Sequence, residues 1–206
     1  MGALLTLFAG GAAAAPPTYA TWNPLDRFTP DADPALGVPT LSTDLLTASY
    51  GGGWFGCRAT IGNVDVDEYF EATVDNSGAG GAPYVGVGVA AASQVLTYMG
   101  DNGGLGWGVM SHGYTCSPSS AVSNGSVLSS GTVVGVANIR STNTVKVYTI
   151  SGGVGTLIAT GDISAASGLG LFPFATVLGG TITANFGATA FAISAVPDGC
   201  RSGVYA

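Results

Sequence analysis

Apolar residues in this chain alternate with polar or small residues at the period of two that is typical of β-strands, and no segment shows a helical period. Residues 55–61 and 67–75 are the clearest cases, and each predicts a half-buried strand with its apolar side chains on one face. The other predicted strands are residues 40–46, 84–90, 94–99, 106–110, 133–137, 145–150, 154–160, 172–178 and 181–186. This pattern predicts an all-β sandwich or barrel.

Glycine-rich turns separate the predicted strands. Residues 100–104 read GDNGG and predict a hairpin between 94–99 and 106–110, and Gly179-Gly180 predicts another between 172–178 and 181–186. Residues 111–130 read as a long polar loop, and loops of that length in compact domains are usually functional or mobile.

Composition narrows the function classes. The 206 residues fit one all-β domain, and only 8% of them are charged, with a net charge of −7. The five cationic residues form no basic stripe, which excludes a nucleic-acid-binding class. So few charges predict that part of the surface is covered by partner subunits, as in a homo-oligomer within a larger assembly.

The three cysteines are far apart and odd in number, so they do not form a disulfide framework. Cys57 lies on the apolar face of a predicted strand and reads as a core residue. A bridge between Cys116 and Cys200 stays open at this point.

The first seventeen residues, MGALLTLFAGGAAAAPP, are apolar and too short to span a bilayer. An exposed apolar terminus would fray, so we expect an anchoring arm that packs on a neighbouring subunit through Leu4, Leu5, Leu7 and Phe8. Two alternatives are a signal peptide, although no Lys or Arg precedes the apolar run, and packing of the segment on its own domain.

Candidate chemistry is sparse. His112 is the only histidine, no GxSxG motif surrounds any serine, and His112 with Cys116 supplies only part of a zinc set. Asp65, Asp67 and Glu68 adjoin a strand start and read as surface acids rather than a glycosidase pair. The glycine-rich segments lack a phosphate-loop motif. We therefore expect no catalytic residue, no metal and no cofactor.

Several blocks in order carry a family resemblance. They are TWNP (21–24), GWFGCRATIG (53–62), EYFEATVD (68–75), YVGVGV (84–89), GWG (106–108), GTVVGVANI (131–139), VKVYTI (145–150), LFPFATV (171–177) and TITANFG (181–187). Together they resemble SPRY (B30.2-like) domains, in particular the compact form found in bacteriophage and bacterial proteins.

The resemblance implies a bent antiparallel β-sandwich over residues 18–195, between the extended arm 1–17 and a C-terminal tail 196–206. It also implies a non-enzymatic domain that binds proteins, and sometimes glycans, through variable loops at one rim. The ligand loops of animal members have no matching motif here, so no specific ligand is carried over.

The function predicted first is a virion structural protein of a bacteriophage, in the head decoration, tail or fibre, with other virion subunits as partners. The alternative is a binding module, extracellular or on a cell surface, that recognises a host glycan or protein through loops holding Asp101, Asn102, His112 and Tyr114. Trp107 reads as a core residue and Tyr114 as a surface residue. A secreted enzyme using His112 is the third hypothesis.

Overall fold

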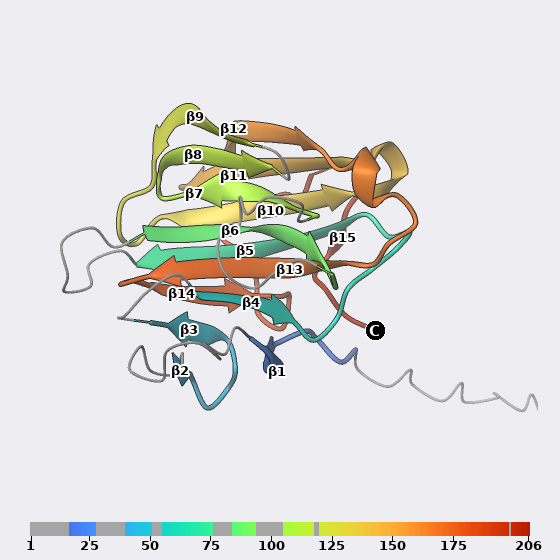
Figure 1. Ribbon diagram of the computed structural model, residues 1–206, viewed down its shortest axis with the longest axis horizontal. Helices are drawn as coiled ribbons and strands as arrows, with labels where there is room; N and C mark the ends of the chain where they lie inside the picture. The colour runs from blue at the N-terminus through green and yellow to red at the C-terminus, as the bar shows by residue number, and fades with distance from the viewer. Residues whose placement is uncertain are drawn as a thin grey trace, which may run out of the picture.

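Two antiparallel sheets pack face to face in this computed structural model (Figure 1). The structure describes residues 17–27, 40–50, 55–75, 84–93, 105–117, 120–197 and 199–206. The seven-stranded sheet has the order β1-β4-β13-β6-β7-β8-β9, and the other sheet has the order β12-β11-β10-β5-β14-β3-β2 with β15 beside β5. The prediction of an all-β antiparallel sandwich is therefore confirmed.

The strands are β1 (Trp22–Arg27), β2 (Thr40–Leu41), β3 (Thr47–Ser49), β4 (Phe55–Ala59), β5 (Glu68–Asp75), β6 (Tyr84–Ala91), β7 (Gly106–Met110), β8 (His112–Ser117), β9 (Ser120–Val127), β10 (Val133–Ile139), β11 (Thr144–Ser151), β12 (Val154–Asp162), β13 (Leu171–Leu178), β14 (Thr181–Asn185) and β15 (Arg201–Ser202). Two short 3-10 turns, η2 (Arg140–Thr142) and η3 (Ser164–Ala166), follow β10 and β12.

The core lies between the two sheets and is built from the apolar positions that the alternation predicts. Phe70 and Val136 are paired across β5 and β10, and both are fully buried. Trp107 of β7 reaches across to β12, where a Cβ atom on Gly161 would lie 1.8 Å from the indole, so only glycine fits there. Trp107 and Cys57 are core residues, as the sequence predicts.

The outer faces of β4 and of the first half of β5 are also buried, which corrects the prediction of half-buried strands there, whereas Thr73 in the second half of β5 is exposed as predicted. Every residue of β4 is buried, including Arg58, whose guanidinium pairs with Asp26 of β1 at 2.7 Å. On β5 the outward Tyr69 and Glu71 are buried as well. Alternation of apolar and polar residues along a strand indicates which side chains share a face, but it does not indicate whether another segment of the chain covers the polar face.

Two further element predictions are wrong. Gly179-Gly180 does not close a hairpin, because β13 pairs with β4 and β6 in one sheet while β14 pairs with β3 and β5 in the other. The turn therefore carries the chain between sheets. Residues 40–46 form only the two-residue β2 and a turn, in which Leu45 adopts a left-handed conformation with φ 58°. The predicted strand 94–99 lies outside the described residues, and β7 pairs on its two sides with β6 and β8.

Residues 18–20, which precede β1, meet the C-terminal residues beside the sandwich. Arg201 and Ser202 pair in parallel with Glu68 and Tyr69, and Val204 is buried in the core. Tyr19 pairs with Tyr205, and their rings stand edge to face 5.4 Å apart. The residues of the predicted tail that the structure describes are thus joined to the sandwich by backbone pairing.

Candidate functional site

The segment predicted as a long polar loop, residues 111–130, is instead a pair of antiparallel strands, which corrects that prediction. β8 pairs with β7 on one side and with β9 on the other. Residues 111–130 are mostly Ser, Thr, Gly and Asn, so the apolar alternation that marks a strand is weak in this segment. Backbone pairing along an existing sheet, rather than core burial, holds this hairpin.

His112 and Tyr114, both predicted in a binding loop, lie on β8, and their rings are in contact across the irregular step at Gly113. The His112 ring lies between two tyrosines, with centroids 4.2 Å from Tyr84 and 4.9 Å from Tyr114. Val127 of β9 is opposite His112 in the strand register. We call these four residues the aromatic corner.

The aromatic corner is presented to solvent on a firm support. Tyr114 is 38% exposed and Val127 is 71% exposed. Tyr84 packs against a buried cluster of Ala90, Met110, Cys116 and Phe174. Gly113, with φ 89°, lies at the irregular step between His112 and Tyr114, a conformation that only glycine adopts easily. Exposed rings above a packed cluster form a preorganised contact surface.

The electrostatics of the aromatic corner are those of a neutral surface. Burial lowers the pKa of His112 below its ordinary value, so the imidazole is uncharged at neutral pH. Its Nδ1 atom is buried and has no hydrogen-bond partner among the described residues. The strand β9 beside it, SAVSNGSV, has no charged residue. This surface therefore suits apolar and aromatic contact rather than ion pairing.

The geometry does not assemble the catalytic or zinc arrangements weighed from the sequence. A catalytic histidine is oriented by an acid on its second ring nitrogen, whereas Nδ1 of His112 has no partner. His112 and Cys116 are four residues apart on a strand, a separation of roughly 13 Å, which is too long for one metal ion. In the part of the chain that the structure describes, no group of three His, Cys, Asp or Glu side chains is placed to hold a metal.

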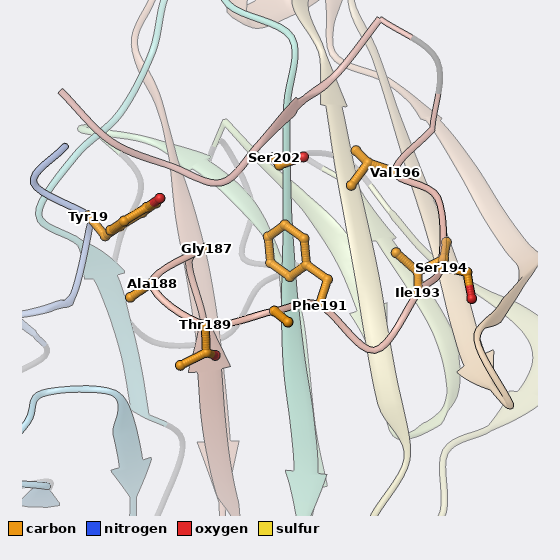
Figure 2. A pocket seen from close by; sticks show the side chains of 10 residues that line it. Tyr19, Gly187, Ala188, Thr189, Phe191, Ile193, Ser194, Val196 and Ser202 are labelled. Atoms are coloured by element: carbon orange, nitrogen blue, oxygen red, sulfur yellow. The ribbon is translucent and has the colours of Figure 1, made fainter. Parts of the chain in front are cut away.

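A second surface lies on the opposite sheet. Residues 187–197, which we call the strap, cross the outer face of the sheet from β14 toward the β11–β12 turn. Figure 2 shows Phe191 in the middle of this segment, above the strands, with Tyr19 and Ser202 beside it. The groove along the strap has a volume of about 710 Å³ and is lined by Tyr19, Gly187, Ala188, Thr189, Ala190, Phe191, Ile193, Ser194, Val196 and Ser202.

The strap is fastened by the buried carboxylate of Glu71. The backbone amides of Ala192 and Ile193 donate to its two oxygens at 2.7 Å and 3.0 Å, and the Tyr69 hydroxyl donates at 3.1 Å. Phe191 stands edge to face on Tyr69 at 5.1 Å. At the far end, the Ser194 amide donates to the Gly153 carbonyl at 2.9 Å. Glu71 is thus a structural residue that the sequence did not single out.

The acids near the start of β5 also differ from the prediction of a surface group. Asp65 is exposed, but Glu68 is fully buried, and its side chain contacts Asn63, Asn138 and Arg201. Burial raises the pKa of Glu68 to about 7 despite these partners. The carboxylate holds Arg201 of β15 at 3.6 Å, so it fastens the C-terminal residues rather than forming a site.

The remaining predicted site residues are placed as follows. Leu4, Leu5, Leu7 and Phe8 of the arm, and Asp101 and Asn102 of the first binding loop, lie outside the described residues. No disulfide joins Cys57, Cys116 or Cys200, so the bridge left open by the sequence is not formed. Within the described ranges, no helix is long and apolar enough to cross a membrane.

Solved structures share this architecture. The chain is similar to stonustoxin at 19% identity and a TM-score of 0.58, over 82% of this chain and 27% of that one. It is similar to the TRIM65 PSpry domain at 14% identity and a TM-score of 0.58, over 82% of this chain and 92% of that domain. The SPRY domain of human HERC1 matches at 13% identity and a TM-score of 0.60, over 79% and 96% respectively.

These likenesses are structural. No protein-family profile and no curated protein sequence matches the chain. The chain spans about a quarter of stonustoxin and nearly the whole of the two SPRY domains. It therefore has a SPRY-like fold, as the sequence blocks predict.

Proposed function

We propose that this SPRY-like chain is a non-enzymatic, protein-binding module and that the aromatic corner is its contact surface. The observation that carries the proposal is the cluster of Tyr84, His112 and Tyr114, in which the His112 ring lies beside both tyrosine rings and Tyr114 is exposed to solvent. SPRY domains are interaction modules as a class, and this class agrees with a site that offers contact area rather than reactive groups.

The chemistry of the corner fits a protein surface. Tyrosine supplies a large amphipathic contact at small entropic cost and is enriched among residues that dominate interface energies. Exposed Val127 extends the apolar area, while the Ser and Asn residues of β9 supply a polar rim without charge. A partner for this surface is expected to present an apolar or aromatic side chain.

Site-specific photo-crosslinking tests the proposal. A photoreactive amino acid replaces Tyr114 in one chain and Leu25 in another, since Leu25 is 94% exposed on β1 at the other end of the sandwich. We expect position 114 to capture a protein and position 25 to capture none. With that protein purified, Tyr114→Ala is expected to weaken binding at least ~10-fold, whereas Leu25→Ala does not change it. Equal capture at the two positions contradicts the proposal.

A glycan ligand is the second candidate, because the aromatic rings of the corner can lie against the apolar face of a sugar. Titration of the intact chain with a glycan array separates the two. Saturable binding of a glycan that is lost in Tyr114→Ala, with no protein captured at position 114, favours the glycan. Capture of a protein with no glycan bound favours the protein-binding module.

We propose further that the chain acts as a structural subunit of a virion, with residues 1–17 as its anchoring arm. The support is the sequence: only 8% of residues are charged, and Leu4, Leu5, Leu7 and Phe8 form an apolar terminal segment. Deleting residues 1–17 is expected to leave a folded sandwich that no longer joins its assembly. Incorporation of the shortened chain at the level of the full chain contradicts the anchoring role. A location outside a virion, extracellular or on a cell surface, is the alternative for the same module.

A further inference from the structure

Strand β12 forms one edge of its sheet and exposes a second apolar surface. Among the described strands, β12 pairs only with β11. It is nine residues long, and Asp162 at its end is its only charged residue. Its apolar side chains are exposed, Val154 at 67% and Leu157 at 50%. Natural edge strands are usually short or carry charges and prolines that prevent pairing with another chain.

We infer that β12 is an interface between two copies of this chain, which pair antiparallel around a two-fold axis at Thr156. With this axis the regular pairs are Thr156 with Thr156 and Gly155 with Leu157, and all of these residues precede the bulge of β12. The register with β11 shifts between Val147 and Tyr148, which leaves Ile158 as the extra residue. Residues 154–157 are therefore the regular part of the free edge.

The register follows from a knob and a hollow on the same strand. Leu157 is paired with Tyr148 of β11 and Gly155 with Ile150, so Leu157 and Gly155 lie on the same face of the sheet. Beside Gly155 is a hollow of about 360 Å³, lined by Tyr148, Gly153, Val154, Gly155, Ile193, Ser194, Ala195 and Pro197. With the axis at Thr156, Leu157 of each copy lies opposite Gly155 of the other and beside this hollow.

The free edge of β12 is self-complementary, which favours a second copy of this chain as its binding partner. A two-fold interface requires that a surface and its complement occur on the same chain, as Leu157 and the hollow do. The axis also brings the two Thr156 residues together, a favourable cross-strand pair. The two Asp162 residues lie beyond the paired segment, roughly 40 Å apart, so their charges do not oppose pairing.

The other edge at this end is less suited. β9 is also unpaired on one side among the described strands, but its Asn124-Gly125-Ser126 segment interrupts the register with β8, and Gly125 has φ 73°. An irregular edge offers fewer consecutive backbone groups to a partner strand. β12 is therefore the edge to which we assign the interface.

Sedimentation of the full chain tests whether this interface exists. The wild-type chain is expected to be a dimer, and Leu157→Lys to raise the dimer dissociation constant at least ~10-fold by placing a charge against the hollow. Leu25→Lys, the same change on the exposed edge strand β1, is the control and is expected to leave the dimer intact. Both sites are exposed, so both variants should fold, which circular dichroism confirms. A monomeric wild-type chain, or a dimer unaffected by Leu157→Lys, overturns the inference.

Cysteine crosslinking tests the register. Thr156→Cys places two thiols at the axis and is expected to give an intermolecular disulfide rapidly under mild oxidation. Thr160→Cys, four residues along the same strand and also exposed, is expected to crosslink no more than the wild-type chain, whose own cysteines set the background. Equal crosslinking at positions 156 and 160 overturns the proposed register.

Discussion

At one end of the sandwich the edge strands are β1 and β2, and at the other end they are β9 and β12 (Figure 1). β2 has two residues, and β1 carries Pro24, Asp26 and Arg27. The amide of Trp22 donates across the β1 edge to the Leu45 carbonyl at 2.8 Å. β9 and β12 have eight and nine residues, without proline, lysine or arginine.

The two ends of the sandwich therefore serve different purposes. We call the end with β1 and β2 the fastened end, because residues 18–22 and the C-terminal residues are hydrogen-bonded to each other and to neighbouring loops there. We call the end with β9 and β12 the open end, because it exposes the apolar side chains of the aromatic corner and of β12. Substitutions should therefore change stability at the fastened end and association at the open end.

The largest expected effect is at the fastened end. Trp22 is fully buried and stands edge to face on Phe186 at 5.1 Å. Trp22→Ala leaves a large cavity there and is expected to lower the free energy of unfolding by ~3–5 kcal/mol. Urea denaturation measures it, with the exposed Leu25→Ala as the control, which should change it by less than ~0.5 kcal/mol. A loss below ~1 kcal/mol for Trp22→Ala contradicts the assignment of this end.

The next effect concerns the strap, which joins β14 near the fastened end to the β11–β12 turn at the open end. Glu71→Gln replaces one acceptor oxygen by an amide, so at least one strap amide loses its partner. We expect a loss of ~1.5–3 kcal/mol, the cost of a hydrogen bond to a charged group. Hydrogen exchange should accelerate at Ala192 and Ile193. Thr189→Ala, exposed on the same strap, is the control; unchanged exchange in Glu71→Gln contradicts the fastening role.

A smaller, pH-dependent effect comes from Glu68. Its pKa is raised by burial from 4.5 to about 7, so between these values the folded chain holds a proton that the unfolded chain releases. The contribution of Glu68 to the free energy of unfolding is therefore largest below pH 4.5 and is lost as pH rises through about 7, a change of roughly 3 kcal/mol. Urea denaturation from pH 4.5 to 8 should show this slope in the wild-type chain and a flatter profile in Glu68→Gln. Identical profiles contradict the assignment.

The smallest expected effect on stability is at the open end. Val127 is 71% exposed, so Val127→Ser should change the free energy of unfolding by less than ~0.5 kcal/mol. The same substitution should weaken binding of the partner captured at position 114. A large loss of stability with binding unchanged would mean that the aromatic corner holds the fold rather than a partner.

The sequence predicts the parts of the fold in which local pattern and tertiary position agree. β6, β7, β10, β11 and β12 alternate clearly or are continuously apolar, and glycines mark their turns, so the predicted ranges agree within a few residues. β8 and β9 were missed because a sheet edge needs backbone pairing but little apolar burial. The crossing at Gly179-Gly180 reads like a hairpin, because a turn between sheets uses the same residues as a turn within one.

The candidate site was only partly predictable. The sequence places His112 and Tyr114 in one binding loop, whereas both lie on β8, and Tyr84 comes to them only through the pairing of β6 with β7 and of β7 with β8. The burial of Glu68 and Glu71 depends on β15 and the strap, more than a hundred residues later in the chain. No local sequence pattern indicates that a distant segment will bury a side chain, so the sequence predicts that these acids are exposed.

The most direct test of the open end as the interaction surface is carbene labelling of the chain, both free and in its native assembly. Labelling is read at Tyr114, Val127 and Leu157 of the open end and at Leu25 of the fastened end. Strong protection of Tyr114 and Val127 in the assembly relative to the free chain, with Leu157 weakly labelled in both because the free chain is already a dimer and with Leu25 labelled as in the free chain, is the predicted result. Protection of Leu25 with Tyr114 and Val127 labelled as in the free chain would contradict it.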